Sequence, residues 1–139
     1  MITLQYEIRL SKKSRGFHLV TDEIVRELED IGKVKAGLAH IFLKHTSASL
    51  TINENADPSV RRDMESFFTD LADHKSYYVH TYEGDDDMPA HIKSSMIGNS
   101  LTIPVTDGRL NLGTWQGIYL NEHRDFASSR SIVVTIQGV

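Results

Sequence analysis

Cysteine is absent from all 139 residues, and its absence removes several kinds of chemistry at once. Disulfides, thiolate zinc sites and cysteine nucleophiles are all excluded. Any metal ion would have to be held by histidine, carboxylate or carbonyl ligands. The chain has seven histidines and 19 acidic residues, so imidazole and carboxylate chemistry is the kind to look for.

Long apolar runs and an excess of positive charge are also missing. No stretch approaches the roughly 18 consecutive apolar residues of a membrane span, and residues 1–15 lack the basic-then-apolar order of a signal peptide. The net charge of −4 argues against binding to nucleic-acid backbones. The basic cluster Lys12, Lys13 and Arg15 is typical of a solvated turn. We therefore expect one cytoplasmic domain over residues 1–139 that binds neither nucleic acid nor membrane.

The first part of the chain predicts strands and two helices. Apolar and polar residues alternate over residues 2–10, which is the period of a half-buried strand. A helix is expected from Thr21 as N-cap to Gly32 as stop, with apolar residues at helical spacing between them. Asp57 and Pro58 begin a second helix. Further strands, rich in β-forming residues, are expected over 36–45, 49–53 and 76–82.

The last part predicts a short third helix and then strands only. Asp87 and Pro89 mark the start of this helix. Asp107 and Gly108 lie between two alternating runs, which is a strong signal for a β-hairpin. Pro104 cannot donate a backbone hydrogen bond, so its strand should lie at an edge or contain a bulge. The remaining strands are expected over 100–105, 109–116, 117–123 and 131–137.

These elements indicate one fold class. Strands outnumber helices, and neighbouring strands are joined by short turns, which is typical of antiparallel pairing. We expect an α+β fold, a largely antiparallel β-sandwich with two to three helices.

Polar residues gather where the chain turns, above all in the stretch HTYEGDDDMPAH, residues 80–91. His45 ends one expected strand, His80 lies near the end of another, and His91 lies one turn inside the third helix. Three imidazoles from separate elements match the ligand count of an open metal site, so we expect them to converge. Acids in the same stretch stand close enough in sequence to orient these ligands or to hold a hard cation such as Mg²⁺.

Each of these residues also has a structural interpretation. Asp57 and Asp87 are suitable helix N-caps. His80 can be a half-buried sheet residue, and the acidic run 85–87 can be a solvated turn. The spacing matches no zinc motif such as HExxH, so both interpretations stay open.

The stretch GTWQG, residues 113–117, is the other informative segment. A tryptophan between glycines indicates a bulge or the close approach of a ligand, and Gln116 offers a donor and an acceptor beside the ring of Trp115. The alternative is a core tryptophan that anchors a hairpin.

Three segments, in this order, resemble the YjbQ family: HTSASLTINENADPSV, HTYEGDDDMPAHIKSSMIG, and SLTIPVTDGRLNLGTWQGIYLNEHRD with the following SRSIVVTIQG. The Gly-Thr-Trp-Gln segment is the hallmark of the family, and the likeness runs from about residue 2 to the end of the chain. The resemblance implies a compact sandwich with helices, assembled as a homotrimer with polar pockets between subunits. It also implies activity as a secondary thiamine-phosphate synthase. Asp85 departs from the asparagine or proline more usual in the family, so the three-acid run is not itself a family magnesium motif.

Carried over residue by residue, the resemblance implies a set of pocket residues. His45, His80 and His91 would hold a divalent metal, Zn²⁺ or Mg²⁺, or would bind phosphate directly. Glu83 and Asp87 would orient them as catalytic residues. Arg130 would be catalytic by pairing with phosphate, or would form a structural ion pair. The substrate-binding candidates are Thr46, Ser47, Asn53, Asp57, Gly84, Trp115 and Gln116.

The reaction implied by the resemblance joins a pyrimidine methyl diphosphate to a thiazole phosphate and releases pyrophosphate. It requires a cation or basic group on the departing diphosphate. The expected function is therefore the binding of a phosphorylated small metabolite, with synthase activity. The alternative is a metal-dependent hydrolase or a metabolite-binding protein whose synthase activity is incidental.

Overall fold

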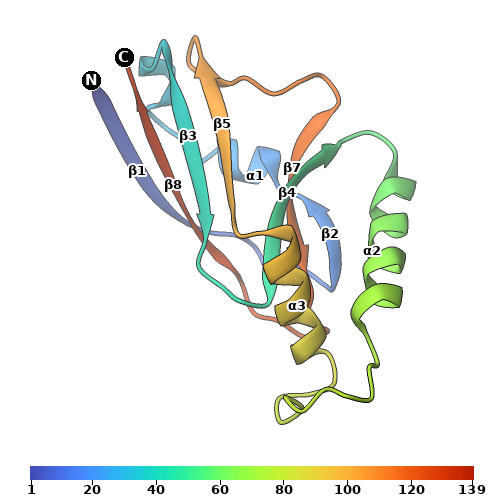
Figure 1. The fold of residues 1–139 in the computed structure, drawn as a ribbon. Helices are drawn as coiled ribbons and strands as arrows, with labels where there is room; N and C mark the ends of the chain where they lie inside the picture. Colours follow the sequence, from blue (N-terminus) through green and yellow to red (C-terminus); the bar gives the residue numbers. More distant parts are fainter.

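Two antiparallel β-sheets form the body of the molecule, in a computed structural model that describes residues 1–139 (Figure 1). The strand order is β1-β8-β3-β5-β6 in the larger sheet and β2-β7-β4 in the smaller one. Every strand pairing is antiparallel. The strands are β1 (Ile2–Arg9), β2 (Gly16–Leu19), β3 (Ala36–Leu43), β4 (Ala48–Glu54), β5 (Ser100–Thr106), β6 (Arg109–Leu110), β7 (Gln116–Glu122) and β8 (Ser131–Gly138).

Three α-helices accompany the sheets. α2 packs against β2 and α3 packs against β4, so both longer helices lie on the smaller sheet. No helix in the structure is both long enough and apolar enough to cross a membrane. The expected α+β class with antiparallel sheets is confirmed. The helices are α1 (Thr21–Val25), α2 (Pro58–Ala72) and α3 (Asp87–Ile97), with a 3₁₀ turn, η1 (Ile31–Lys33).

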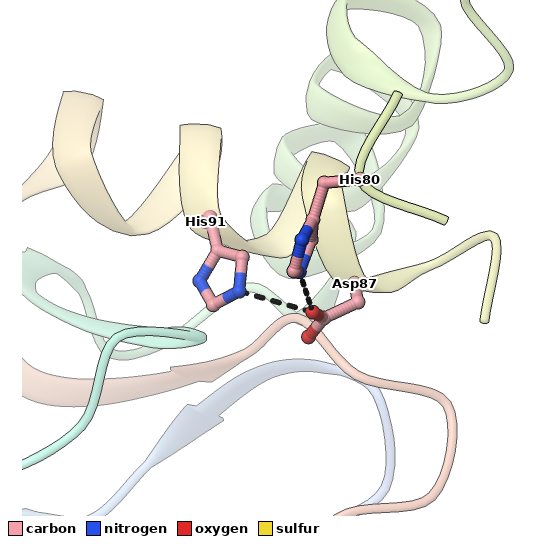
Figure 2. Close-up of side chains that lie close together, drawn as sticks. All are labelled: His80, Asp87 and His91. Carbon is pink, nitrogen blue, oxygen red and sulfur yellow. Dashed lines mark hydrogen bonds and ion pairs between the residues drawn. The ribbon is translucent and has the colours of Figure 1, made fainter. Parts of the chain in front are cut away.

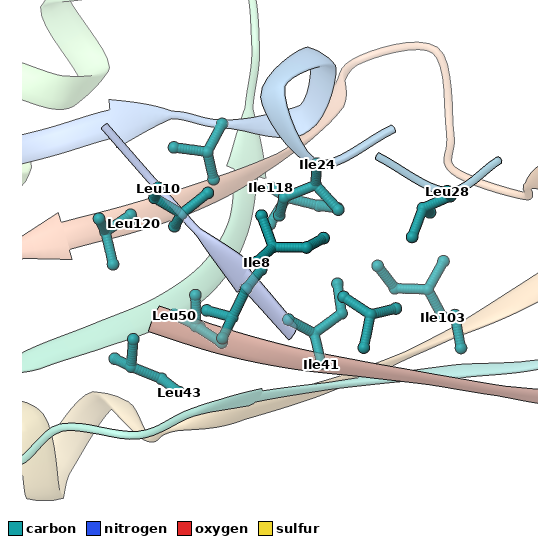
Figure 3. Close-up of a cluster of buried hydrophobic side chains, with 14 of the residues drawn as sticks. Ile8, Leu10, Ile24, Leu28, Ile41, Leu43, Leu50, Ile103, Ile118 and Leu120 are labelled. Atoms are coloured by element: carbon teal, nitrogen blue, oxygen red, sulfur yellow. The ribbon is translucent and has the colours of Figure 1, made fainter. Parts of the chain in front are cut away.

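The hydrophobic core lies between the two sheets (Figure 3). Alternation along β8 shows how the sequence produces it, because Ile132, Val134 and Ile136 are fully buried while the residues between them face away. Ile118 and Leu120 of β7 enter the same core from the other sheet. Each fully buried aliphatic side chain stabilises the fold by about 1.5–3 kcal/mol. The core therefore fixes β7 and its neighbour β4, which carry the polar sites at their ends.

The second expected helix, α2, begins as the sequence predicts. Asp57 Oδ1 accepts a hydrogen bond of 2.9 Å from the backbone N–H of Ser59, and Pro58 occupies the first turn. The third expected helix, α3, is also confirmed, but Asp87 is not its N-cap. The cap position belongs to Asp86, which makes no capping hydrogen bond with its side chain.

The hairpin predicted at Asp107 and Gly108 is confirmed. β5 and β6 pair through Thr106 and Arg109, and the two turn residues have φ angles of 49° and 78°. Positive φ at both positions is what a two-residue hairpin turn requires. Pro104 pairs with Leu38 of β3 and lies just beyond the short pairing of β5 with β6, where its carbonyl oxygen accepts a hydrogen bond from the N–H of Asn111 at 2.7 Å and no donor is required of it.

The first expected helix is much shorter than predicted. The prediction of a helix from Thr21 to Gly32 was wrong, because α1 ends at Val25. The backbone N–H of Leu28 donates to the carbonyl oxygen of Val25, three residues earlier, as in a 3₁₀ turn. These tighter turns still bury Ile24 and Leu28, so the apolar spacing is satisfied without a continuous α-helix.

The strand expected over residues 76–82 was also wrong. This segment belongs to the connection between α2 and α3, and the N–H of Tyr78 donates to the carbonyl oxygen of Lys75 in a turn. Val79 and Tyr82 are almost fully exposed. Alternating apolar residues form a strand only where a sheet offers a partner, and this connection lies beside the ends of two helices, away from both sheets (Figure 1).

Two further differences from the predicted strands concern β2 and β6. β2 was not predicted, because four residues are too few to show a period. The strand expected over 109–116 is limited to Arg109–Leu110, and the chain then turns, with the N–H of Gln116 donating to the Gly113 carbonyl.

Arg15 is not solvated as expected. It forms ion pairs with three carboxylates, one on α2 and two in the loops after α2 and β7: Glu65, Asp73 and Asp125.

Candidate functional site

His80, Asp87 and His91 form a compact cluster at the start of α3 (Figure 2). The Nε2 atoms of His80 and His91 lie 2.7 Å and 3.0 Å from the same oxygen, Asp87 Oδ2. The three candidate ligand atoms all lie within 4.8 Å of one another. Two imidazole nitrogens and one carboxylate oxygen therefore face one small space, as the ligands of a metal ion do.

The local sequence explains this convergence. Asp87 and His91 are four residues apart on α3, so one helical turn places them on the same face. Gly84 has a φ of 112°, and its N–H donates to the carbonyl oxygen of Thr81 in a tight turn. Glycine adopts this backbone conformation without strain, and the turn brings His80 back over the first turn of the helix.

A hydrogen bond to Thr46 fixes the ring of His91. His91 Nδ1 lies 2.8 Å from the Thr46 carbonyl oxygen, which can only accept, so Nδ1 carries the proton. In the neutral ring, Nε2 is then an unprotonated nitrogen facing the Asp87 carboxylate. Two lone pairs at 3.0 Å repel each other unless a positive charge lies between them, either a second ring proton or a metal ion. An N–H donated to a carbonyl is the usual support of a metal-ligating histidine.

The Asp87 carboxylate is buried and ionised. Its side chain is 1% exposed, and burial alone would raise its pKa. The hydrogen bond from His80 and the positive charges of His91 and Arg124 outweigh burial and hold the pKa of Asp87 below its usual value. Arg124 Nη1 lies 2.6 Å from Asp87 Oδ1, which leaves Oδ2 to the two histidines.

Arg124 is a site residue that the sequence interpretation missed. Its Nε lies 2.8 Å from Asp86 Oδ2, and its Nη2 donates to the carbonyl oxygen of Glu83 at 2.9 Å. The hydrogen bond to Asp86 is the main reason that the pKa of Arg124 is raised. The available signal was its position directly after β7, because strand ends commonly present functional groups. Of Glu83 itself, only the backbone joins this network, and its side chain is exposed.

Two cavities border the cluster. One, of about 290 Å³, lies beside His80, and the other, of about 260 Å³, lies beside His91. The side chains of His80 and His91 are 46% and 31% exposed. A metal ion with three protein ligands keeps a coordination position for water or substrate. The residues present therefore fit a metal ion that a ligand could reach from either cavity.

His45 lies outside the cluster. Its Nε2 accepts a hydrogen bond of 2.8 Å from the backbone N–H of Ser131. Burial and the charge of Arg130 lower the pKa of His45, which keeps the ring neutral. Together with Thr46, His45 lines the cavity beside His91. Asp87 is thus the third member of the cluster, and His45 borders the space next to it.

Arg130 forms a buried ion pair. Its Nε and Nη2 lie 2.7 Å and 2.5 Å from the two carboxylate oxygens of Glu122. Nη2 also donates to Ser47 Oγ at 2.9 Å. Both charged side chains are almost completely buried, so each neutralises the other inside the protein. The ion pair with Glu122 corresponds to the structural alternative for Arg130. The same guanidinium group also engages the hydroxyl of Ser47.

The remaining predicted residues lie at the opposite end of β4 and β7. Trp115 and Gln116 stand where β7 begins, and Asn53 and Asp57 stand near the end of β4 and the start of α2. β4 has seven residues, so the two ends of the strand pair are about 20 Å apart. Trp115 is 67% exposed, which excludes the alternative of a core tryptophan within the chain. In one chain, these four residues do not meet the histidine cluster.

Similarity to known proteins extends along nearly the whole chain. A family profile described as UPF0047 protein YjbQ-like matches residues 6–139. The chain belongs to the YjbQ-like family. The UPF0047 protein YjbQ of Escherichia coli O157:H7 is 59% identical over 134 residues, which are 96% of this chain and 97% of that protein. The UPF0047 protein YugU of Bacillus subtilis strain 168 is 40% identical over 86% of this chain and 87% of its own.

Solved structures of YjbQ-like proteins have the same fold. A YbjQ-like protein of unknown function from Sulfolobus solfataricus superposes with a TM-score of 0.85 at 26% identity and covers 99% of both chains. A YjbQ/UPF0047 family protein from Clostridium acetobutylicum gives a TM-score of 0.79 at 38% identity, covering 96% of this chain and 99% of that one. The YjbQ-like fold is therefore common to bacterial and archaeal members of the family.

Proposed function

We propose that this protein holds a divalent metal ion at His80, Asp87 and His91 and binds a phosphorylated small metabolite there, with secondary thiamine-phosphate synthase activity. The observation that carries the proposal is the pair of imidazole Nε2 atoms on one buried carboxylate oxygen, with the ring of His91 fixed by Thr46. The synthase activity comes from the resemblance of the sequence motifs to the YjbQ family.

The set of ligand atoms favours Zn²⁺ over Mg²⁺. Imidazole suits zinc and related transition metals, whereas Mg²⁺ prefers six oxygen ligands in octahedral geometry. When bound, such a metal supplies a positive centre that stabilises charge on phosphate oxygens. Pyrophosphate is the leaving group of the proposed reaction, so charge stabilisation at its oxygens is the main requirement.

The surrounding residues hold the ligands in position. Arg124 fixes one oxygen of Asp87 and so orients the other toward the histidines. The Thr46 carbonyl selects the ring state of His91 in which Nε2 is free to ligate. Both residues therefore act on the ligands and prepare the site before any substrate binds.

The proposed assembly is a homotrimer in which a neighbouring copy completes the pocket. Trp115 and Gln116 lie at the opposite end of the β4–β7 strand pair from the histidines, and this pair is about 20 Å long, so a second copy would be needed to bring them together. The outer face of the larger sheet supports association, because Leu38 and Phe42 of β3 are exposed there, 55% and 41%. These two side chains, with the exposed His40 between them, would be covered in such an interface.

A coupled assay tests the function. Protein loaded with Zn²⁺ and freed of excess metal is given the pyrimidine methyl diphosphate and the thiazole phosphate, and thiamine phosphate and pyrophosphate are measured together. We expect equal amounts of both products, loss of both after chelation, and loss of both in His91→Ala. No thiamine phosphate from the metal-loaded protein would contradict the synthase activity.

The same assay separates the alternative of a metal-dependent hydrolase. A hydrolase would release phosphate or pyrophosphate from one substrate alone, without forming thiamine phosphate. The two histidines of the cluster are partly exposed, so water could reach a metal ion held there, as a metal-dependent hydrolase would require. Product release that does not require the thiazole phosphate would favour it.

A further inference from the structure

The two cavities that border the cluster differ in chemical character. The cavity beside His80 is formed by the connection between α2 and α3, residues 74–81, with Asp85 and Met88. Its lining includes a lysine, two histidines and several hydroxyl groups. The cavity beside His91 has no lysine, arginine or carboxylate, and beside its two histidines its polar side chains are hydroxyls and one amide. The cluster thus lies between a cavity that carries charged side chains, Lys75 and Asp85, and a cavity that has no lysine, arginine or carboxylate.

Lys75 indicates an anion in the cavity beside His80. Its side chain is half-buried, yet it makes no ion pair or hydrogen bond within the chain. Other shielded cations of this region are paired: Lys93 and Arg15 each lie 2.7 Å from oxygens of Asp73. Because the Lys75 ammonium group forms no ion pair within the chain, it is available to a negatively charged ligand.

The wall that carries Lys75 is held in place by its own hydrogen bonds. The hydroxyl of Tyr78 donates to the Ala72 carbonyl oxygen at 2.5 Å, which ties the segment to the end of α2. The N–H of Tyr78 donates to the carbonyl oxygen of Lys75 itself. The hydroxyls of Ser76 and Thr81 make no hydrogen bond within the chain, so two further donors remain for a ligand.

We propose that this cavity is the phosphate subsite of the metal centre: Lys75, Ser76 and Thr81 bind the oxygens of a phosphate group beside His80. The neutral cavity beside His91 then receives an uncharged, polar part of the substrate. This inference rests on the proposed function, because it takes the metal centre as the point between the two cavities.

Asp85 allows a second test of whether charge in this cavity controls anion binding. Its carboxylate lines the same cavity and makes no ion pair in the chain, so it repels a bound anion. Neutralising Lys75 should therefore weaken phosphate binding, and neutralising Asp85 should strengthen it. Effects of opposite sign from two neighbouring surface changes would not arise from a general disturbance of the loop.

The experiment is calorimetric titration of inorganic phosphate into full-length, Zn²⁺-loaded protein. We expect Lys75→Gln to raise the Kd about tenfold and Asp85→Asn to lower it about threefold. Lys12→Gln and Asp63→Asn, at exposed positions outside the cavity, should leave it within about twofold. Metal content and circular dichroism are measured for every variant and should not change.

Failure of the subsite and failure of the metal centre give different results. If metal is retained and both cavity variants bind phosphate as the unmodified protein does, the subsite is wrong and the metal centre stands. If the protein holds no metal, the proposed function fails, and titration of the metal-free protein still decides the subsite. Phosphate binding that depends on Lys75 would then support it, and no binding would overturn it.

Discussion

At the scale of single residues, the site depends on a carboxylate whose two oxygens have different partners. Arg124 contacts Oδ1 of Asp87, and the two histidines share Oδ2. An arginine that fixes one oxygen also fixes the direction in which the other points. Arg124 is therefore a positioning residue for the proposed metal ligands, although it ligates nothing itself.

Replacing Arg124 tests this role. Arg124→Met should lower the affinity for Zn²⁺ by about 10–100-fold, because Asp87 loses the partner that orients it. The affinity is measured by competition with a chromophoric chelator. Arg109→Met, at an exposed position in the β5–β6 hairpin, is the matched control and should bind Zn²⁺ as the unmodified protein does. Equal affinity in the Arg124 variant would contradict the positioning role.

His123 is a buried histidine that affects stability. Its side chain is 1% exposed, and its Nε2 lies 2.8 Å from Ser49 Oγ. Burial lowers the pKa of His123 to about 3. An unfolded histidine has a pKa of about 6.5, so below that pH the unfolded chain binds more protons than the folded one. The contribution of His123 to stability is thus complete above pH 6.5 and is lost as the pH falls toward 3.

Urea unfolding between pH 7 and pH 5 tests this dependence. The free energy of unfolding should fall by about 2 kcal/mol between pH 7 and pH 5 from His123 alone, because the loss reaches its full rate of about 1.4 kcal/mol per pH unit only well below pH 6.5. His123→Gln should be less stable at pH 7 but should lose stability less steeply, because the titrating group is gone. His45, whose pKa is also lowered, contributes equally to both proteins. Identical slopes would show that His123 is not the group responsible.

The residues of the site were only partly predictable from the sequence. His80 and His91 were predicted as metal ligands, together with His45, because imidazoles and acids are concentrated where the chain turns. Asp87 was predicted only to orient the ligands, whereas the structure places its carboxylate in the cluster and His45 outside it. Arg124 could not be assigned, because its contact with Asp87 spans 37 residues and depends on how β7 and α3 pack. The orientation of the His45 ring could not be predicted either, because the ring accepts a hydrogen bond from the backbone N–H of Ser131, 86 residues away.

At the scale of secondary structure, the start of α2 depends on one cap. Asp57→Ala should lower the melting temperature by roughly 2–6 °C, because the N–H of Ser59 loses its acceptor. Asp63→Ala, on the exposed surface of the same helix, is the matched control and should change it much less. Thermal unfolding followed by circular dichroism gives both values. Equal shifts would contradict a specific capping effect.

Elements with local signals were predictable, and elements that depend on distant partners were not. The capped helix at Pro58 and the hairpin at Asp107 follow from short-range chemistry, and the structure contains both. Residues 76–82 alternate like a strand, but no sheet edge lies beside them. The helix expected up to Gly32 breaks after Val25 because tighter turns bury the same apolar residues.

At the scale of the whole molecule, the exposed sheet face predicts association. Leu38→Glu combined with Phe42→Glu should convert the proposed trimer into a monomer, because charge would have to be buried between copies. Light scattering at micromolar concentration measures the mass. Phe126→Glu, at an almost fully exposed position in the loop before β8, is the control and should leave the mass unchanged. A monomeric unmodified protein would contradict the shared pocket as well.

The metal content of purified protein tests the central claim most directly. After loading with Zn²⁺ and removal of excess metal, the unmodified protein should contain one ion per chain. His80→Ala and His91→Ala should lose most of it while melting close to the unmodified protein, because both side chains are partly exposed. His18→Ala, whose ring contacts the Ser14 carbonyl outside the cluster, should keep the full content. Full metal content in both cluster variants, or none in the unmodified protein, would contradict the account.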